Sequence, residues 1–297
     1  MEIGHKIQHQ KMVERTAQVK IGITGSNGRL GSQLLLMGGI PMECDITDVD
    51  SIAMSIAMVK PDIIINCAAY TKVDDCETTE GWNKAVKVNF RGVENLRNVY
   101  SGRLLHISTD YIFNGKGGPY AETNKSYDPV NQYGSSKLGG EIALLNPEDK
   151  KKETCIVRTT GLYGATMSKD DVANMVVERL SEGRYLTMTN ELMGNQTYIP
   201  HLAEALMKLA GMEWTHKVIH IGSEEVLSRY EFALMVASVF GLDKSLISFC
   251  RNKDVLGWVA QRPKKGGLKT NVAKRMRLPI YTVLDGIRRL RDDTRGI

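Results

Sequence analysis

A glycine-rich loop between an apolar strand and a helix is the feature that most constrains the fold of this chain. The stretch VKIGITG, residues 19–25, is short, apolar and β-branched, which is typical of a strand buried in a parallel sheet. It runs into TGSNGRLG, residues 24–31, and then into residues with helical spacing. Gly25, Gly28 and Gly31 are spaced to provide a sharp turn, an open face for a pyrophosphate and close packing of the helix. This context favours a dinucleotide-binding loop over a purely structural turn.

Further apolar strands alternate with helices along the chain. Runs at residues 61–69, 103–109, 154–160 and 217–223 are predicted strands, and most of the stretches between them have helical periodicity. This alternation predicts an α/β fold, a Rossmann-like doubly wound parallel sheet, with a smaller, mostly helical substrate lobe. The predicted divisions are a flexible N-terminal extension at 1–18, a Rossmann domain at 19–165 rejoined by about 217–223, and a substrate lobe at 166–216 and 224–297.

The composition argues against several classes of protein. No run approaches the roughly 18 apolar residues of a membrane span, and the polar N-terminus lacks the apolar core of a signal peptide. Five scattered cysteines without a C-x-x-C pattern speak against a disulfide framework and a zinc site and fit the cytoplasm, and no metal is expected. Residues 251–297 hold 13 Lys or Arg against 4 Asp or Glu. A solvated basic face is the first interpretation, a site for an anionic substrate such as a nucleotide diphosphate the second, and nucleic acid the third.

The ribose end of the predicted cofactor site is less well defined. Asp45 lies 20 residues after Gly25, where an acidic residue that binds the adenosine ribose is expected. The intervening sequence leaves room for only a stub of a second strand, and Asp45 begins DITD, which is typical of the entry to a helix capped by Asp48. Arg29, inside the glycine loop, favours a 2′-phosphate and therefore NADPH, although NADH stays open.

A hydroxyl, a phenol and an ammonium are expected to converge beside the nicotinamide. The strand RLLHIST ends at Thr109, and ligands of a parallel sheet lie beyond the carboxyl ends of its strands. Tyr133 begins the next helix, and Lys137 shares its face one turn later. We hypothesise that Tyr133 protonates a carbonyl oxygen held by Thr109, and that Lys137 lowers the pKa of the phenol and holds the nicotinamide ribose.

These residues resemble those of an extended short-chain dehydrogenase/reductase, most of all the dTDP-4-dehydrorhamnose reductases. The matching stretches run in family order over about residues 19–270, and STDYIFNG and YGSSK are the most specific of them. The resemblance implies an NAD(P)H-dependent oxidoreductase that reduces a 4-keto-6-deoxy nucleotide sugar, with a nucleotide-diphosphate sugar as partner, no nucleic acid or membrane, and room for a homodimer. It implies a catalytic triad of Thr109, Tyr133 and Lys137, with Asp110, Tyr111 and Arg262 at the substrate. The implied cofactor contacts are Gly25, Asn27, Gly28, Arg29, Leu30, Gly31, Asp45, Ile46, Ala68, Ala69, Tyr70, Asn89, Tyr133 and Lys137.

Some of these residues have purely structural alternatives. Asn89 is as well explained by a tie between helix and strand, Tyr70 by packing, and Asp110 by capping of a turn. The chain also departs from the family's pattern. Gly161 stands in RTTGLYG where the family usually has a Trp near the sugar, and NELMGNQT replaces the usual segment that begins with Asp-Gln. These departures leave the identity of the substrate open.

Four other functions compete with the reductase. Nucleotide-sugar dehydratases of the same superfamily place two carboxylates after the Thr, whereas Asp110 is followed here by Tyr111. The regulatory β subunit of methionine adenosyltransferase shares many of these motifs without turnover, but the present chain keeps the whole Thr-Tyr-Lys set. A different nucleotide-sugar-modifying activity of the same superfamily is also an open alternative. A nucleic-acid-binding role is the last, and it would require salt-sensitive binding.

Overall fold

A parallel sheet of six strands forms the centre of the computed structural model, which describes residues 19–145, 153–164, 171–255 and 257–295. Its strand order is β2-β1-β3-β4-β5-β8, and every neighbouring pair is parallel. The predicted doubly wound α/β fold is therefore confirmed, including the late strand that rejoins the sheet beside β5. The extension predicted at 1–18 lies outside the described residues. The strands are β1 Ile21–Thr24, β2 Ile40–Pro41, β3 Ile63–Asn66, β4 Arg103–Thr109, β5 Thr154–Thr159 and β8 Val218–His220.

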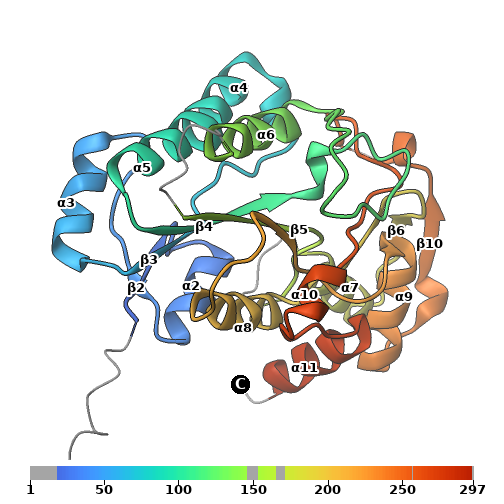
Figure 1. Cartoon of the computed structure of the whole chain (residues 1–297). Helices are drawn as coiled ribbons and strands as arrows, with labels where there is room; N and C mark the ends of the chain where they lie inside the picture. Colours follow the sequence, from blue (N-terminus) through green and yellow to red (C-terminus); the bar gives the residue numbers. More distant parts are fainter. Residues whose placement is uncertain (1–18, 146–152, 165–170, 256, 296–297) are drawn as a thin grey trace, which may run out of the picture.

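Helices cover both faces of this sheet, as Figure 1 shows. Apolar residues of the strands pack in two clusters, one on each face, and this burial is the main source of stability for the layers. One face carries α3 Val49–Val59, α4 Thr79–Ala85, α5 Val93–Val99 and α6 Gln132–Leu144. The other carries α2 Arg29–Leu36, α8 Ile199–Ala210 and α10 Asn271–Arg275.

The second strand is the stub that the sequence predicts. β2 has two residues, and α3 begins soon after it at Val49. The Asp48 side chain accepts hydrogen bonds from the N–H groups of Asp50 and Ser51, so it caps α3 as expected. The short β2 leaves Asp45 in an irregular segment rather than at the end of a strand.

The helical stretch between β3 and β4 contains a wider turn. α4 and α5 are joined by a π-helical segment, Val86–Gly92, that contains Asn89. Single π-helical turns inside α-helices are frequent at functional sites. The backbone carbonyl of Asn89 would lie 2.3 Å from a Cβ at Gly140, so α6 approaches this segment as closely as a glycine allows.

A second, smaller cluster of helices and short strands builds the remainder of the chain. Its apolar core joins α7 Val172–Ser181, α9 Arg229–Phe240 and α11 Val283–Arg295 with the strands β6 and β10. Short paired strands occur here that the periodicity did not predict. They are β6 Leu186–Thr189 with β10 Ile247–Cys250, and β7 Met193–Gly194 with β9 Leu227–Ser228.

Single 3₁₀ turns lie at Asp75–Glu77, Asp110–Ile112, Lys244–Leu246 and Asn252–Asp254.

The predicted boundary between the two lobes differs from the packing at one helix. The sequence assigns residues 166–216 to the substrate lobe, but α8 buries its apolar side chains in the same cluster as β1, β3 and α2. Leu202, Leu206 and Leu209 are at most 1% exposed there. The division into lobes stays a prediction, with α8 placed by its packing on the face of the main sheet.

Candidate functional site

The glycine loop leaves an open face above the first turn of α2. Gly25 has φ +62°, and a Cβ there would lie 2.6 Å from the backbone nitrogen of Ala68. A Cβ at Gly31 would lie 2.2 Å from the carbonyl oxygen of Gly25. A Cβ at Gly28, in contrast, would meet only that oxygen, at 3.2 Å. The turn and the helix packing therefore require glycine at two positions, whereas at Gly28 the space faces outward, where a ligand would lie.

The N-terminus of α2 is suited to an anion. Gly28 is its N-cap and provides no side chain to bind the first N–H groups, and the first turn holds no acidic residue. Free N–H groups and the positive end of the helix dipole attract a pyrophosphate. Asn27 is exposed beside this opening, whereas Leu30 is 7% exposed and anchors the helix in the core. The residues of the loop thus fit the phosphates of a dinucleotide.

The Arg29 side chain forms a contact that the sequence did not predict. Its guanidinium forms an ion pair with Asp171, which is buried, and also donates to the carbonyls of Leu162 and Gly164 at 3.3 and 3.4 Å. The predicted contact with a 2′-phosphate is therefore not supported by its geometry. The pair instead joins the glycine loop to Asp171, the N-cap residue of α7.

The two residues expected at the adenine lie in different surroundings. Asp45 is exposed, and its carboxylate accepts from the N–H of Thr47 at 2.9 Å. That hydrogen bond holds the pKa of Asp45 below its ordinary value. Ile46 is 3% exposed and packs in the core cluster beside Gly92. Asp45 is therefore accessible to a ribose or an adenine, while the side chain of Ile46 contributes mainly to packing.

Asn89 connects the loop after β3 to α6. Its amide exchanges hydrogen bonds with the backbone of Tyr70, at 2.8 and 2.9 Å, and donates to the hydroxyl of Ser136 at 2.9 Å. These bonds fix the Ala68–Tyr70 segment, which lies between the glycine loop and α6. These contacts are the tie between helix and strand that the structural alternative for Asn89 describes, and Ala68 of the segment that it holds lies against Gly25 of the glycine loop.

Thr109 and Tyr133 meet at the carboxyl end of β4. Thr109 ends the strand, Tyr133 lies in the first turn of α6, and the Thr109 hydroxyl is among the groups that act on the pKa of the phenol. The Tyr133 ring is half-buried and meets the ring of Tyr111 edge-on, with centroids 5.8 Å apart. Burial raises the pKa of the Tyr133 phenol, with Tyr111 and Asp110 adding to the effect and Thr109 opposing it. The structure thus brings the predicted hydroxyl and phenol together and keeps the phenol protonated.

Lys137 lies one turn further along α6, but its nitrogen is directed at the sheet. Nζ donates to the carbonyl of Ile107 at 2.7 Å and lies 3.4 Å from Nε2 of His106. Burial lowers the pKa of Lys137 to about 8. In this arrangement burial raises the pKa of the Tyr133 phenol. The lowering expected from Lys137 is therefore not seen here, and its role toward the phenol stays a prediction.

The two residues after Thr109 differ in accessibility. Asp110 is 1% exposed, and its carboxylate accepts from the N–H of Gly267 at 3.0 Å. Burial raises the pKa of Asp110, against the hydrogen bonds from Gly267 and the Thr160 side chain. Asp110 therefore holds the segment around Gly267 beside the site. This role is similar to the capping of a turn, the structural alternative given for Asp110. Tyr111 is only partly buried, and its ring contacts the ring of Tyr133.

Arg262 stands beside a second arginine that the sequence did not identify. Its guanidinium binds both carboxylate oxygens of Asp74, at 3.0 and 2.5 Å, and lies 4.7 Å from the Trp258 ring. Arg229 lies 5.2 Å from the same ring, and the described residues provide it no ion-pair partner. Its neighbours include Tyr111. Arg229 is the first residue of α9, where the helix dipole disfavours a cation. This unfavourable placement of a positive charge is the signal by which the sequence could have pointed to Arg229.

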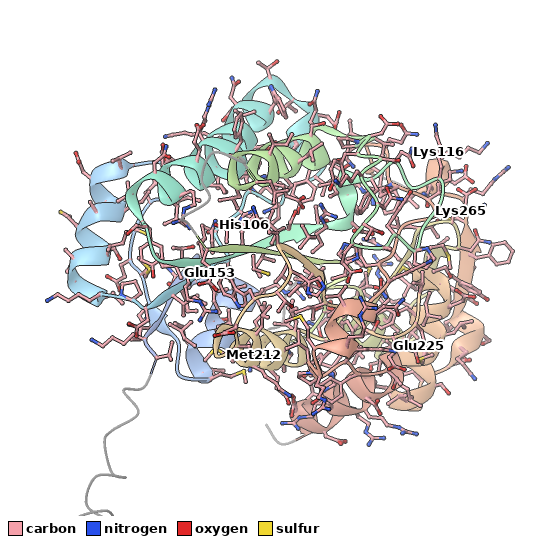
Figure 2. All side chains as sticks on the ribbon, viewed as in Figure 1. His106, Lys116, Glu153, Met212, Glu225 and Lys265 are labelled. Carbon is pink, nitrogen blue, oxygen red and sulfur yellow. The ribbon has the colours of Figure 1, made fainter. Side chains whose placement is uncertain are left out.

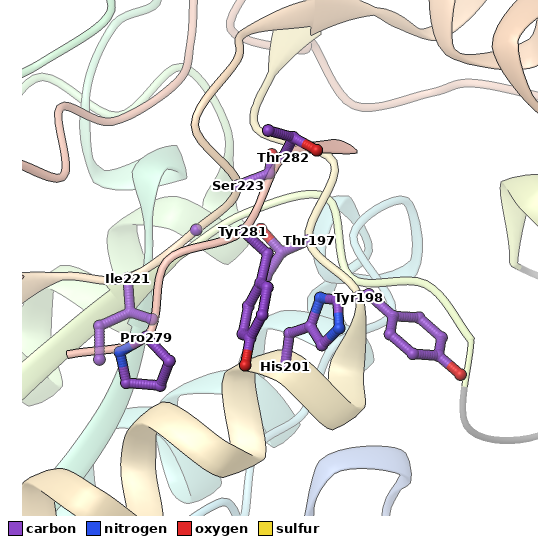
Figure 3. A pocket seen from close by; sticks show the side chains of 9 residues that line it. Thr197, Tyr198, His201, Ile221, Ser223, Pro279, Tyr281 and Thr282 are labelled. Atoms are coloured by element: carbon purple, nitrogen blue, oxygen red, sulfur yellow. The ribbon is translucent and has the colours of Figure 1, made fainter. Parts of the chain in front are cut away.

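Two hollows lie outside this constellation. An open pocket of about 600 Å³ adjoins the loop at Gly266 and is lined by Gly118, Pro119, Asn190, Glu191, Met193, Val226, Lys264, Lys265 and Gly266. A much smaller one, of about 10 Å³, lies where His201 of α8 stacks on Tyr281, with ring centroids 3.8 Å apart (Figure 3). Among the described residues we find no group of three or more His, Cys, Asp or Glu that could hold a metal ion. Across the same ranges, no helix has the length and apolar character needed to cross a membrane.

Comparison with known proteins identifies the family of this chain. The family model of the RmlD substrate binding domain matches residues 19–289. A dTDP-4-dehydrorhamnose reductase of Mycobacterium tuberculosis is 35% identical over 242 residues, which are 75% of this chain and 76% of that protein. A spore coat polysaccharide biosynthesis protein of Bacillus subtilis is 32% identical over 247 residues, 77% of this chain and 82% of that protein.

A solved structure is similar over almost the whole chain. It is the dTDP-4-dehydrorhamnose reductase of Bacillus anthracis in complex with NADP, with a TM-score of 0.83 and 27% identity. The match covers 92% of this chain and 99% of that one. Together with the family model and the identity to curated relatives, this shows that the chain belongs to the family of the RmlD substrate binding domain.

Proposed function

We propose that this chain is an NAD(P)H-dependent reductase of a 4-keto-6-deoxy nucleotide sugar, with dTDP-4-dehydrorhamnose as the first substrate to test. The observation that carries the proposal is the meeting of the Thr109 hydroxyl and the Tyr133 phenol at the carboxyl end of β4. The glycine loop that fits a pyrophosphate opens at the same edge of the sheet. The family relatives named as reductases of this substrate support it further.

The glycine loop, the N-terminus of α2 and the Ala68–Tyr70 segment are the parts that would hold the dinucleotide. When bound, the nicotinamide would supply a hydride. Asp45, which is exposed, would interact with the adenosine end, and Lys137 would hold the nicotinamide ribose. Arg29 has no part in this scheme, because it is paired with Asp171. The choice between NADPH and NADH therefore rests on residues other than Arg29.

Tyr133 is the proton donor in this scheme. Its raised pKa keeps the phenol protonated at neutral pH, which is the form that a reduction requires. The oxygen of a ketone that receives a hydride becomes an alkoxide, a much stronger base than a phenolate, so the proton passes to it readily. Thr109 holds the same oxygen by a hydrogen bond. A positioned general acid contributes about 10²–10⁴-fold to the rate.

The basic side chains around Trp258 are the proposed site for the substrate diphosphate. The charge of Arg262 is already balanced by Asp74, whereas Arg229 has no such partner among the described residues. One positive charge is therefore left for an anion. The pocket of about 600 Å³ near Gly266 is a separate hollow, lined by Lys264 and Lys265, and its volume lies within the usual size range of ligand sites.

The sugar specificity depends on segments where this chain departs from its family. Gly161 leaves out the indole that is usual near the sugar, and its backbone has φ +60°. Asn190, Glu191 and Met193 line the larger pocket and belong to the departing segment NELMGNQT. We expect these positions to determine which 4-keto sugar is accepted.

The decisive experiment is NADPH oxidation measured across a panel of dTDP- and UDP-linked 4-keto-6-deoxy sugars. We expect turnover with at least one of them, and near-complete loss in a folded Tyr133→Phe variant. Cofactor binding without turnover on any member would contradict the proposal and favour a regulatory role. A cytoplasmic location and a homodimer stay predictions, supported respectively by five free cysteines and by the family resemblance.

A further inference from the structure

A row of four polar side chains crosses the sheet beneath α6, and it contains a histidine that the proposed mechanism does not use. Thr24, Asn66 and His106 are register partners on β1, β3 and β4. Lys137 reaches the end of this row from α6, with Nζ 3.4 Å from Nε2 of His106. His106 has no exposed surface and lies between the sheet and the layer of α6 (Figure 2).

The orientation of the Asn66 amide is fixed by two donors. The backbone N–H of Ala68 donates to Asn66 Oδ1 at 3.2 Å, and the Thr24 hydroxyl donates to the same oxygen at 2.6 Å. A backbone N–H cannot accept, so turning the amide over would place two donors against each other. The Asn66 NH₂ group therefore faces His106.

This orientation decides where His106 carries its proton. Asn66 Nδ2 lies 3.0 Å from Nδ1 of His106, and because Nδ2 is a donor, Nδ1 must be the bare, accepting nitrogen. A neutral imidazole then carries its proton on Nε2. The doubly protonated form would direct two donors at each other at Nδ1, and burial also holds the pKa of His106 far below its ordinary value.

The proton on Nε2 is directed at the nitrogen of Lys137. An ammonium has three donors and no acceptor, so it would face Nε2–H with like polarity, whereas a neutral amine accepts that hydrogen with its lone pair. The amine still donates to the carbonyl of Ile107 at 2.7 Å. We propose that His106 is a positioning residue that controls the charge of Lys137, favouring the neutral amine in the cofactor-free chain through its Nε2–H.

Other groups around Lys137 act in known directions. Glu141, one turn later on α6, raises the pKa of Lys137, but its carboxylate is already bound by Arg158. Cys67, at the end of β3, also raises it, and its own thiol pKa is raised to about 12 by burial, so it is uncharged near neutrality. Burial acts against both and is the largest effect, and the pKa of Lys137 falls to about 8.

The tautomer of His106 can be observed directly. In protein labelled with ¹⁵N-histidine, two-bond ¹H–¹⁵N correlation spectra distinguish a protonated from a bare ring nitrogen. We expect the His106 spin system to have its proton on Nε2 and to stay unchanged from pH 6 to 9. Assignment comes from the signal lost in His106→Leu or, if that variant does not fold, by elimination with variants at the other five histidines. A proton on Nδ1 would overturn the inference.

The effect on Lys137 is tested by its titration in the cofactor-free chain. In protein labelled with ¹³C at the lysine ε-carbon, we expect Lys137 to titrate near pH 8 in the native chain. In His106→Leu the opposing N–H is gone, so the midpoint should move upward by about one pH unit, a typical size for a change in local environment. An unchanged or lower midpoint would overturn the inference. His201→Leu removes a histidine far from the row and should leave the midpoint in place.

A second variant reverses the polarity of the row. In Asn66→Asp the new carboxylate accepts from Nδ1–H, so His106 should change to the other tautomer and offer a bare Nε2 to an ammonium. We expect the NMR signature of His106 to switch and the Lys137 midpoint to rise. Retention of the proton on Nε2 in the folded variant would count against the inference.

The consequence for activity rests on the proposed function. If the charged lysine holds the ribose, cofactor affinity is present below the Lys137 midpoint and lost as pH rises through it. That loss should occur at higher pH in His106→Leu than in the native chain, whereas a purely structural role would lower affinity at every pH. The NMR measurements do not depend on turnover, so they fail or succeed separately from the proposed reductase activity.

Discussion

A pair of glycine substitutions in one loop separates a cofactor contact from a folding requirement. Gly28 has φ −77° and ψ 167°, an extended conformation that any residue adopts, and a Cβ there meets only the carbonyl oxygen of Gly25, at 3.2 Å. Gly28→Val should therefore lower the free energy of unfolding by only about 1 kcal/mol, the usual size of an unfavourable N-cap residue. Gly31→Ala would place a Cβ 2.2 Å from the same oxygen, and we expect it to destabilise the fold by about 1–3 kcal/mol or more.

The effect on binding should be the reverse. A side chain at Gly28 blocks the approach of a pyrophosphate to the N–H groups of α2. Hydrogen bonds to a charged group contribute about 1.5–3 kcal/mol each, so loss of one or two weakens NADPH binding by on the order of 100-fold or more. NADPH fluorescence titration and urea denaturation measure the two quantities. A folded Gly28→Val chain with unchanged NADPH affinity would refute the assignment of the loop.

Three further predictions concern other parts of the molecule. Glu141→Gln leaves the guanidinium of Arg158 without its buried partner, so we expect a loss of about 3–5 kcal/mol in urea denaturation, and a loss under 1 kcal/mol would contradict this. Arg229→Ala should raise KM for the nucleotide sugar at least several-fold with little change in kcat, because it removes a charge proposed to bind the diphosphate and not the reacting carbonyl; an unchanged KM would exclude it from the diphosphate site. Gly161→Ala should destabilise the chain by about 1–3 kcal/mol, since φ is +60° and the Cβ would lie 2.6 Å from the carbonyl oxygen of Asn195; a variant as heat-stable as the native chain would contradict this.

The local patterns of the sequence predict the main sheet well, because its signals are short-range. A glycine loop between strand and helix, an Asp at the start of α3 and apolar runs of four to seven residues each depend on neighbours in sequence. The pairs β6 with β10 and β7 with β9 join residues far apart in sequence, and their strands of two to four residues carry little periodic signal. Those pairs could not be predicted from local pattern.

The side-chain partners of the site were harder to predict than its position. The spacing of Tyr133 and Lys137 placed both on one face of α6, but it gave no information on what lies opposite Lys137. His106 comes from a neighbouring strand, and only the register of β3 and β4 places it beside Asn66. Arg29 was likewise assigned to a phosphate from its place in the glycine loop. Its partner in the structure, Asp171, is 142 residues away, and no local pattern indicates that pair. Long-range pairing of this kind cannot be predicted from a local sequence pattern.

The most direct test of the account is the rate of NADPH oxidation with dTDP-4-dehydrorhamnose, measured for the native chain and for Tyr133→Phe. The substitution removes only the phenolic oxygen, so both proteins should fold and bind NADPH alike. We predict turnover by the native chain and a rate on the order of 10²–10⁴-fold lower in the variant. Equal rates in the two proteins, or a native chain that binds NADPH and reduces no 4-keto sugar, would contradict the proposed chemistry.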